Sequence, residues 1–288
     1  MIVRGIASGR DSPHDILIGT LRVNERLRGR VFKFIANTNY FGMALTQSWP
    51  SEWQAVILAG GLGTRMRPIT ETIPKPMIAV AGKPFLQWQL DLLQNGGIKR
   101  ALLLVAYLGE QIEQYFGDGQ KFGGHVGYSY EPSPLGTGGA LKNAEGKLQD
   151  WFVLVNGDTY LAIDYERLVR DFLQANCAAM IVAYEKPAVA AADVPASELP
   201  GNLGLGLDGM VTAYRKREPA GLNHIDAGVI VLKKEILVGL PVGQKCSLEE
   251  EIYPHLIARR EMQAWVTREA FYDMGSPAGL AALEAKLG

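Results

Sequence analysis

The chain has 288 residues, 48% of them hydrophobic, and its formal net charge is −1. This length allows a full core, and one large α/β domain is the simplest arrangement. The near-zero charge, without a sustained run of Lys and Arg, argues against a nucleic-acid partner or an anionic membrane surface. No apolar run approaches a membrane span and no signal-peptide pattern opens the chain, so we expect a cytoplasmic protein. The only cysteines, Cys177 and Cys246, lack metal-ligand spacing and argue against a disulfide framework or a zinc site.

Residues 1–52 form a basic extension that differs from the rest of the chain. Six arginines lie within its first thirty residues, and no long amphipathic period runs through it. It could be an added module, an oligomerisation arm or the product of a start codon placed too far upstream, and we favour the last of these. The second region, residues 53–288, contains every motif discussed below.

A glycine-rich turn follows the apolar run at residues 55–58. This run predicts a buried parallel strand because it lacks polar alternation. Gly60, Gly61 and Gly63 carry no Cβ, so the backbone can approach a ligand and direct N–H groups at an anion. Glycines after a strand are also common for structural reasons, so this spacing alone leaves phosphate binding and a plain turn equally open.

Two basic residues, Arg65 and Lys75, follow the turn, and three prolines at positions 68, 74 and 76 stiffen this segment. Charges held in this way need not be ordered when an anion binds. The dinucleotide-binding fingerprint requires a third glycine where this chain has Met66, which disfavours a hydride-transfer enzyme. No Gly-Lys-Ser/Thr sequence closes the turn, so the P-loop is disfavoured as well.

Buried strands and amphipathic helices alternate after this segment. The expected strands lie at 101–106, 126–130, 152–158 and 178–184, and the expected helices at 85–94, 109–116, 140–147 and 164–176. A hairpin is expected at 203–207 and 211–214, a strand at 224–232, and helices at 247–257 and 278–287. This rhythm predicts a Rossmann-like three-layer α/β/α fold with a mainly parallel, mixed central sheet. Ligands of such sheets lie beyond the carboxyl ends of the strands.

Two acidic residues lie where expected strands end. Glu131 precedes a second glycine-rich turn, whose small residues would let a planar base approach the backbone. Its carboxylate could accept hydrogen bonds from the two adjacent donors of guanine, whereas uracil and thymine offer only one such donor. A glutamate at the end of a strand is, however, more often merely solvated. Asp158 ends the fourth strand, where an unpaired carboxylate is costly without a cation or hydrogen bonds. A cap, a turn and a metal ligand all remain open for Asp158.

Together these segments resemble the sugar-1-phosphate nucleotidyltransferases, also called NDP-sugar pyrophosphorylases. The shared motifs are Gly-Gly-Leu-Gly-Thr-Arg at 60–65, Pro-Lys-Pro at 74–76, Pro-Leu-Gly-Thr-Gly-Gly at 134–139, Asn-Gly-Asp at 156–158 and Asp-Met-Gly-Ser-Pro at 273–277. The resemblance covers roughly residues 54 to 287 and is strongest to guanylyltransferases that use D-glycero-D-manno-heptose 1-phosphate, followed by those that use mannose 1-phosphate. It implies the nucleotide-diphospho-sugar transferase type of fold.

The resemblance also implies roles for individual residues. Arg65 and Lys75 would be catalytic, and Asp158 and Asp273, each expected at the carboxyl edge of the same sheet, would bind Mg²⁺. The implied nucleotide-binding residues are Leu58, Ala59, Gly60, Gly61, Gly63, Thr64, Glu131, Leu135, Gly136, Thr137 and Gly138.

For the sugar phosphate, the resemblance implies Asp226 together with Lys216 or Arg217. Asp226 stands in place of the family's asparagine and could equally be a turn residue. Lys216-Arg217 replaces a Glu-Lys pair, and the missing glutamate puts the identity of the sugar in question. The acidic run at 249–251 lies in the first turn of its helix, where it complements the helix dipole and needs no further role.

The implied reaction joins an NTP, GTP first, to a sugar 1-phosphate, the heptose first, and releases pyrophosphate. Such a product would serve nucleotide-sugar biosynthesis for a cell-surface polysaccharide. Alternatives are a mannose-1-phosphate guanylyltransferase, a UTP- or dTTP-dependent enzyme acting on a hexose or amino-sugar 1-phosphate, and a catalytically inactive nucleotide-binding regulatory subunit. Retention of both basic residues and both aspartates favours an enzyme. A homo-oligomer is left open.

Overall fold

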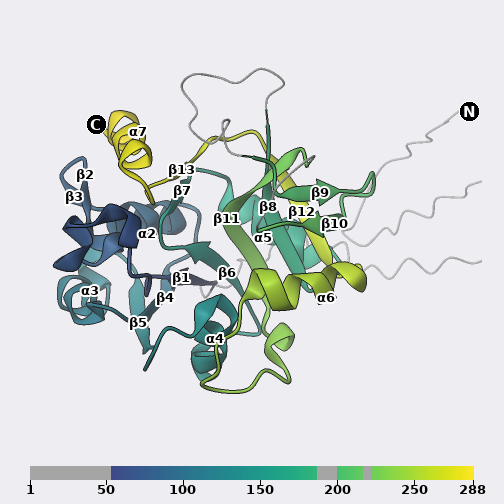
Figure 1. Cartoon of the computed structure of the whole chain (residues 1–288), viewed down its shortest axis with the longest axis horizontal. Coiled ribbons are helices and arrows are strands. Elements are labelled where there is room, and N and C mark those ends of the chain that lie inside the picture. Colours follow the sequence, from purple (N-terminus) through teal and green to yellow (C-terminus); the bar gives the residue numbers. More distant parts are fainter. Residues whose placement is uncertain (1–52, 187–199, 217–221) are drawn as a thin grey trace, which may run out of the picture. The chain divides into compact units, whose positions relative to one another are not determined.

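The computed structural model describes residues 53–186, 200–216 and 222–288 (Figure 1). The N-terminal extension, residues 187–199, which are rich in Ala and Pro, and residues 217–221, among them Arg217, lie outside the described residues. Among the described residues, no helix combines the length and the apolar character needed to cross a membrane.

A nine-stranded mixed sheet forms the centre of the described part (Figure 1). Its strands are β1 (Gln54–Leu58), β4 (Arg100–Val105), β5 (His125–Tyr130), β6 (Trp151–Asn156), β8 (Ala179–Glu185), β9 (Leu203–Leu205), β10 (Val211–Tyr214), β11 (His224–Lys233) and β12 (Met262–Thr267). β5, β4, β1 and β6 lie side by side and run parallel. β11 runs antiparallel to both β6 and β8, and β12 runs parallel to β8. The predicted mainly parallel, mixed sheet is confirmed.

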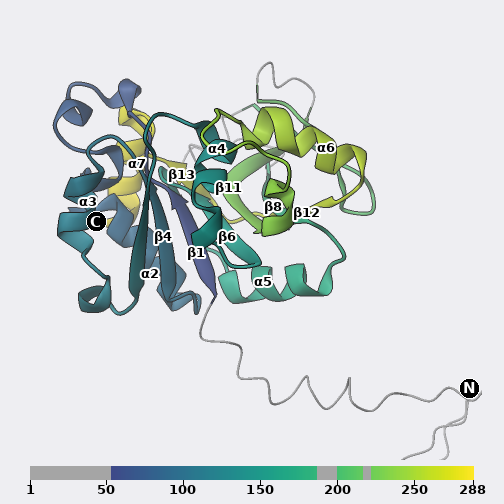
Figure 2. The same ribbon diagram turned by 90° about the horizontal axis from the view of Figure 1, so that it is seen from below.

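Helices cover both faces of this sheet (Figure 2). One face is covered by α2 (Phe85–Asn95), α3 (Gly109–Phe116) and α5 (Tyr165–Gln174), and the other by α4 (Gly136–Asn143), a single π-helical turn η8 (Leu248–Ile252) and α6 (Tyr253–Ala258). The helices form where the sequence is amphipathic: Leu168, Val169 and Phe172 of α5 are buried, and Asp164 caps its first turn through the N–H of Arg167 at 2.8 Å.

Two small sheets and the last helix form a separate core beside the main sheet. The sheets pair β7 (Thr159–Leu161) with β13 (Phe271–Asp273), and β2 (Ala79–Val80) with β3 (Lys83–Pro84); the helix is α7 (Pro277–Leu287). Short 3₁₀ helices lie at η1 (Thr64–Met66), η2 (Ile69–Glu71), η3 (Lys75–Met77), η4 (Gln120–Phe122), η5 (Glu145–Lys147) and η7 (Lys234–Leu237). Phe85, Tyr160, Met274 and Leu283 pack together in this core. β2, β3, β7, β12 and β13 were not predicted.

Two element boundaries differ from the predictions in ways that shape the site. β6 ends at Asn156, so Asp158 lies in the turn after the strand. α4 begins at Gly136 instead of residue 140, because its first turn lies against the main chain at Cys246. The carbonyl of Cys246 accepts hydrogen bonds from the N–H groups of Gly138 and Gly139 at 3.0 and 3.2 Å. A distant segment thus supplies bonds that extend the helix into the glycine-rich turn.

Candidate active site

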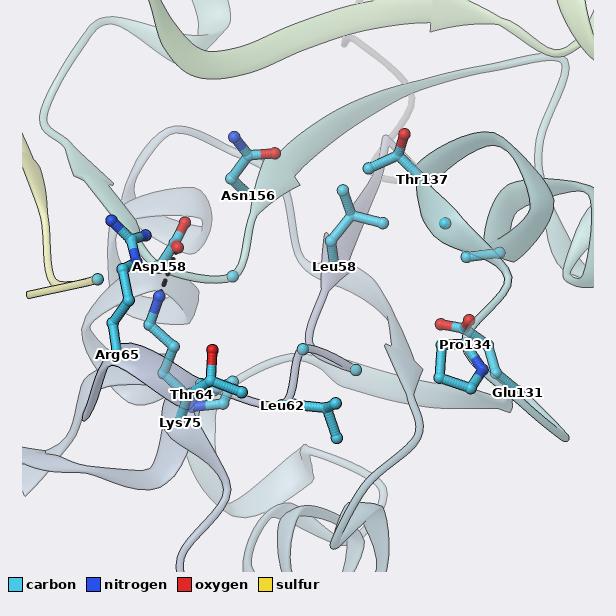
Figure 3. Close-up of a pocket in the computed structure, with 18 of the residues that line it drawn as sticks. Leu58, Leu62, Thr64, Arg65, Lys75, Glu131, Pro134, Thr137, Asn156 and Asp158 are labelled. Carbon is cyan, nitrogen blue, oxygen red and sulfur yellow. Dashed lines mark hydrogen bonds and ion pairs between the residues drawn. The ribbon is translucent and has the colours of Figure 1, made fainter. Parts of the chain in front are cut away.

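The carboxyl ends of the four parallel strands meet at one edge of the sheet, as expected for this fold. Leu58 at the end of β1 pairs with Leu104 on one side and Asn156 on the other. A cavity of about 600 Å³ opens above this edge (Figure 3). It is lined by Leu58, Gly60, Gly61, Leu62, Gly63, Thr64, Arg65, Lys75, Pro76, Glu131, Pro134, Gly136, Thr137, Ala140, Asn156, Gly157, Asp158, Glu249 and Gly275. The predicted glycine turns and basic residues therefore come together.

The first glycine-rich turn forms the floor of the cavity. Gly63 has a φ of 60°, and a Cβ there would lie 2.8 Å from Cγ2 of Thr70, so only glycine fits without strain. At Gly60 a Cβ would lie 3.0 Å from Oε1 of Glu131, which shows how closely the two turns approach. A Cβ at Gly61 would face open space, so the bare backbone there is accessible to a ligand.

The segment that carries both basic residues is tied down along its length. The hydroxyl of Thr70 donates to the carbonyl of Gly63 at 2.8 Å. Tyr107, which follows β4, donates from its hydroxyl to Glu71 O at 2.8 Å. Gln111, in the first turn of α3, donates from Nε2 to Thr72 O at 3.0 Å. The chain therefore holds Arg65 and Lys75 in place through main-chain bonds as well as through its prolines.

The two basic residues have different partners. Nζ of Lys75 lies 2.5 Å from Oδ2 of Asp158 in an ion pair whose members are both partly buried. Arg65 makes no hydrogen bond or ion pair with another described residue, and its guanidinium lies against Gly275, where a Cβ would be 2.5 Å from Nη2. Figure 3 shows Arg65, Lys75 and Asp158 on the same side of the cavity. Lys75 is thus neutralised in part, whereas Arg65 is available to an anion.

The two predicted metal-binding aspartates lie close together, but not at the edge of one sheet as expected. Asp158 follows β6 of the main sheet, whereas Asp273 ends β13 of the small β7–β13 sheet. The N–H of Met274 donates to Asp158 O at 3.0 Å, which joins the two segments. Burial raises the pKa of Asp273, and the negative charge of Asp158 raises it further. Asp273 lies near Asp158 because β13 pairs with β7, the strand that begins directly after Asp158.

The side of the cavity opposite the basic residues is formed by Glu131 and the start of α4 (Figure 3). Oε2 of Glu131 accepts from the N–H of Leu135 at 3.0 Å, and burial raises the pKa of this carboxyl group. Thr137 lines the cavity, but its hydroxyl donates to Glu249 at 2.8 Å and accepts from the N–H of Leu248. The predicted residues Ala59, Leu135 and Gly138 lie behind the wall and do not line the cavity.

Two of the predicted sugar-phosphate residues, Asp226 and Lys216, lie outside this cavity but next to it. Asp226 lines a small recess together with Leu58, Thr137, Asn156 and Glu249, which line the cavity as well. Its Oδ1 accepts from the N–H of Gly228 at 2.9 Å and its Oδ2 from the hydroxyl of Tyr214 at 3.0 Å. Burial raises the pKa of Asp226 to about 6, although these two hydrogen bonds oppose the shift. Nζ of Lys216 lies 3.3 Å from Oε2 of Glu249, whereas Arg217 lies outside the described residues.

Residues 54–287 match the sequence pattern of a family described as "Nucleotidyl transferase". The chain belongs to the nucleotidyl transferase family. This match spans every motif on which the resemblance to sugar-1-phosphate nucleotidyltransferases rests, and the predicted family is confirmed.

Relatives within the nucleotidyl transferase family support the same conclusion. The chain is 35% identical over 229 residues to a mannose-1-phosphate guanylyltransferase of Mycobacterium tuberculosis, covering 77% of this chain and 61% of that protein. It is 33% identical over 227 residues to a D-glycero-alpha-D-manno-heptose 1-phosphate guanylyltransferase of Campylobacter jejuni, covering 78% and 95%. A crystal structure of HddC from Yersinia pseudotuberculosis complexed with GMP-PN matches with a TM-score of 0.67 at 30% identity, covering 82% of this chain and 100% of that one. The chain thus spans less than two thirds of the first of these proteins.

Eight residues that line the cavity of this nucleotidyl transferase were not among the predicted site residues: Leu62, Pro76, Pro134, Ala140, Asn156, Gly157, Glu249 and Gly275. The only role expected for Glu249 was to complement the helix dipole, but its carboxylate also makes side-chain hydrogen bonds. Its Oε2 accepts from the hydroxyls of Ser247 and Thr137 at 2.7 and 2.8 Å. Burial acts to raise the pKa of Glu249, but these hydrogen bonds and Lys216 lower it overall, so the carboxylate is charged. No signal in the sequence separates Glu249 from the two glutamates that follow it.

Proposed function

We propose that this chain transfers a nucleotidyl group from an NTP to a sugar 1-phosphate and releases pyrophosphate. The observation that carries the proposal is the cavity itself. At one side two basic residues adjoin a turn of exposed backbone N–H groups, and at the other a turn of small residues lies beside Glu131. The first side suits a triphosphate and the second suits a planar base, so one nucleotide would span the cavity.

The reaction needs no protein nucleophile. An oxygen of the sugar phosphate attacks the α-phosphorus in line, the bond to the pyrophosphate breaks, and negative charge grows on the transferring group and on the leaving group. Arg65, which makes no hydrogen bond or ion pair with another described residue, can stabilise this charge. Lys75 can do the same while its ion pair with Asp158 keeps its ammonium group in place. The protein positions two polyanions and offsets their charge.

The residues present fit a magnesium ion. Asp158 and Asp273 are adjacent carboxylates whose repulsion contributes to the raised pKa of Asp273, and a divalent cation would relieve that repulsion. Mg²⁺ commonly takes one or two protein carboxylates together with phosphate oxygens and water, and no cluster of three His, Cys, Asp or Glu side chains competes for this role among the described residues. When bound, the ion would clamp the nucleotide phosphates and offset developing charge. Asp158 and Asp273 would hold it.

We propose GTP as the nucleotide. Oε2 of Glu131 accepts from the N–H of Leu135, so Oε1, which lies beside Gly60, is the oxygen that would accept from the edge of the guanine. Both relatives named above are guanylyltransferases, and the HddC structure contains GMP-PN. Replacing Glu131 by Gln should narrow the preference for GTP over the other nucleoside triphosphates.

For the sugar we propose D-glycero-D-manno-heptose 1-phosphate, with mannose 1-phosphate as the alternative. The Campylobacter jejuni relative, named for the heptose, is covered over 95% of its length. Asp226 lies in the recess beside the cavity. Lys216 is paired with Glu249, which lines both the recess and the cavity. In this proposal the product enters nucleotide-sugar biosynthesis in the cytoplasm for a cell-surface polysaccharide. UTP- or dTTP-dependent transfer remains the second substrate class.

A matrix of initial rates tests the substrates. Pyrophosphate release would be measured with GTP, ATP, CTP and UTP, each with heptose, mannose and glucose 1-phosphates, in Mg²⁺ and in EDTA. The proposal expects the highest kcat/KM for GTP with the heptose and no turnover in EDTA. A preference for UTP or CTP would contradict the guanine assignment but leave the reaction class intact. Nucleotide binding without turnover for any pair would favour an inactive regulatory subunit.

A further inference from the structure

A buried glutamine outside the cavity is bonded to the turn that carries Asp158. Gln89 lies on α2, is 2% exposed, and donates from Nε2 to two main-chain carbonyls, those of Asn156 and Thr159, both at 2.8 Å. These residues flank Gly157 and Asp158. One amide group of α2 therefore closes the turn by holding both of its ends.

The orientation of this amide follows from its partners. Both neighbours of Nε2 are carbonyl oxygens, which can only accept, so the NH₂ end of the side chain must face them. Oε1 is then left buried without a hydrogen-bond partner in the part of the chain that the structure describes. A buried polar atom without a partner is unfavourable. An apolar side chain at this position would not leave a buried oxygen unpaired. The two hydrogen bonds that Gln89 donates are therefore the reason for a glutamine here.

The turn has little freedom apart from this amide. A Cβ on Gly157 would lie 2.1 Å from the carbonyl oxygen of Leu58, so the turn passes directly over the end of β1. Thr159, one of the two residues bonded to Gln89, pairs with Asp273 across the β7–β13 sheet. The side-chain amide of Gln89 therefore also holds Thr159 of β7, the residue that pairs with Asp273 of β13.

We propose that Gln89 is a positioning residue that sets the geometry of Asp158 and Asp273, and through them the affinity for the divalent cation. The inference rests on the metal role proposed above. Gln89 itself touches neither substrate nor metal. Outer partners of metal ligands typically contribute about 10- to 100-fold in metal affinity or activity, which gives the size of the expected effect.

The experiment compares Gln89→Met with a matched control, Gln54→Met. Gln54 is also a buried glutamine with two main-chain partners, the carbonyl of Lys147 and the N–H of Gln149, both at 2.9 Å, and it lies outside the cavity lining. Three quantities would be measured for both variants and the wild type: the Mg²⁺ concentration for half-maximal turnover, Mn²⁺ binding by electron paramagnetic resonance, and hydrogen exchange of the amides of Asp158 and Thr159.

Gln89→Met should need about 10-fold more Mg²⁺, bind Mn²⁺ correspondingly more weakly and exchange these two amides faster, with a smaller change in the KM for GTP. Gln54→Met should leave all three quantities at the wild-type level. Gln89→Asn keeps the NH₂ group but is one methylene shorter, so it should fall between wild type and Gln89→Met.

Equal metal requirements in Gln89→Met and Gln54→Met would overturn the inference. Loss of folding in both Gln89 variants would overturn it as well, because Gln89 would then serve the fold. Full wild-type activity in EDTA would instead refute the proposed metal role. Hydrogen exchange at the turn would still decide separately whether Gln89 holds it.

Discussion

The two basic residues of the cavity differ in what they can contribute to catalysis. Lys75 is already paired with Asp158, whereas Arg65 makes no hydrogen bond or ion pair with another described residue, although its charge acts on Asp273. A guanidinium that is held in place but not engaged in an ion pair can interact with the charge that develops during transfer. We therefore assign transition-state stabilisation mainly to Arg65 and anchoring mainly to Lys75.

Replacing Arg65 by Ala should lower kcat by about 10²- to 10³-fold, because one preorganised electrostatic contact in the transition state contributes this much. The Kd for GTP should change far less. Steady-state kinetics and equilibrium titration with a non-hydrolysable GTP analogue would separate the two effects. Arg67 is exposed in the same segment and does not line the cavity, so Arg67→Ala is the matched control. A near wild-type kcat in Arg65→Ala would contradict the assignment.

Asp226 makes stability depend on pH. Its pKa is raised from 3.8 to about 6, so between about pH 4 and pH 6 the folded state holds a proton that the unfolded state has lost. Stability from this group is therefore present at pH 4 and lost as pH rises through 6. Asp226→Asn, which stays neutral, should raise the free energy of unfolding at pH 7.5 by up to about 3 kcal/mol and change it little at pH 4.

Urea unfolding at the two pH values measures this effect. Asp150→Asn is the control, because the side chain of Asp150 is 98% exposed. An equal increase in the free energy of unfolding of Asp226→Asn at both pH values would show that Asp226 does not titrate in this range.

At the scale of elements, the start of α4 depends on a segment more than one hundred residues away. The main chain at residues 244–246 packs against the glycines of α4, and a Cβ on Gly139 would lie 2.5 Å from the carbonyl oxygen of Gln244. Thr137 and Glu249 add a side-chain bond between the same two segments at 2.8 Å. This contact shapes the wall of the cavity that α4 forms, where we propose that the base binds.

Gly139→Ala should therefore destabilise the protein by about 1–3 kcal/mol and weaken GTP binding, because the methyl group would push the two segments apart. Gly146 offers a matched control, since a Cβ there would meet nothing within 4 Å. Gly146→Ala should leave both properties unchanged. Thermal unfolding and GTP titration would compare the two variants. Equal stability and equal GTP affinity in Gly139→Ala and Gly146→Ala would contradict the proposed role of this contact.

Elements whose signal is local could be predicted from the sequence. Unbroken apolar runs gave β1, β4 and β6, and the meeting of their carboxyl ends placed the glycine turns, Arg65 and Lys75 at one cavity. The three-residue strands β7 and β13 carry no comparable periodicity, and they decide where Asp273 lies. Glu249 and Gln89 act through partners far away in sequence. Their roles depend on tertiary packing, which no local pattern encodes.

At the scale of the whole molecule, all family motifs lie after the N-terminal extension. A chain that begins at Ser51 should therefore fold and turn over with the kcat and KM of the full chain. Circular dichroism, gel filtration and initial rates test this expectation. Insolubility, or a change in oligomeric state on truncation, would show that residues 1–52 have a structural role.

The central claim is that the cavity transfers a nucleotidyl group between two bound substrates. The most direct test follows pyrophosphate and nucleotide sugar together after GTP, Mg²⁺ and a sugar 1-phosphate are mixed with the protein. We expect both products to appear in equal amounts, only when both substrates are present, and we expect Arg65→Ala to suppress both alike. Failure to form nucleotide sugar with any sugar 1-phosphate, in a protein that still binds GTP, would contradict it.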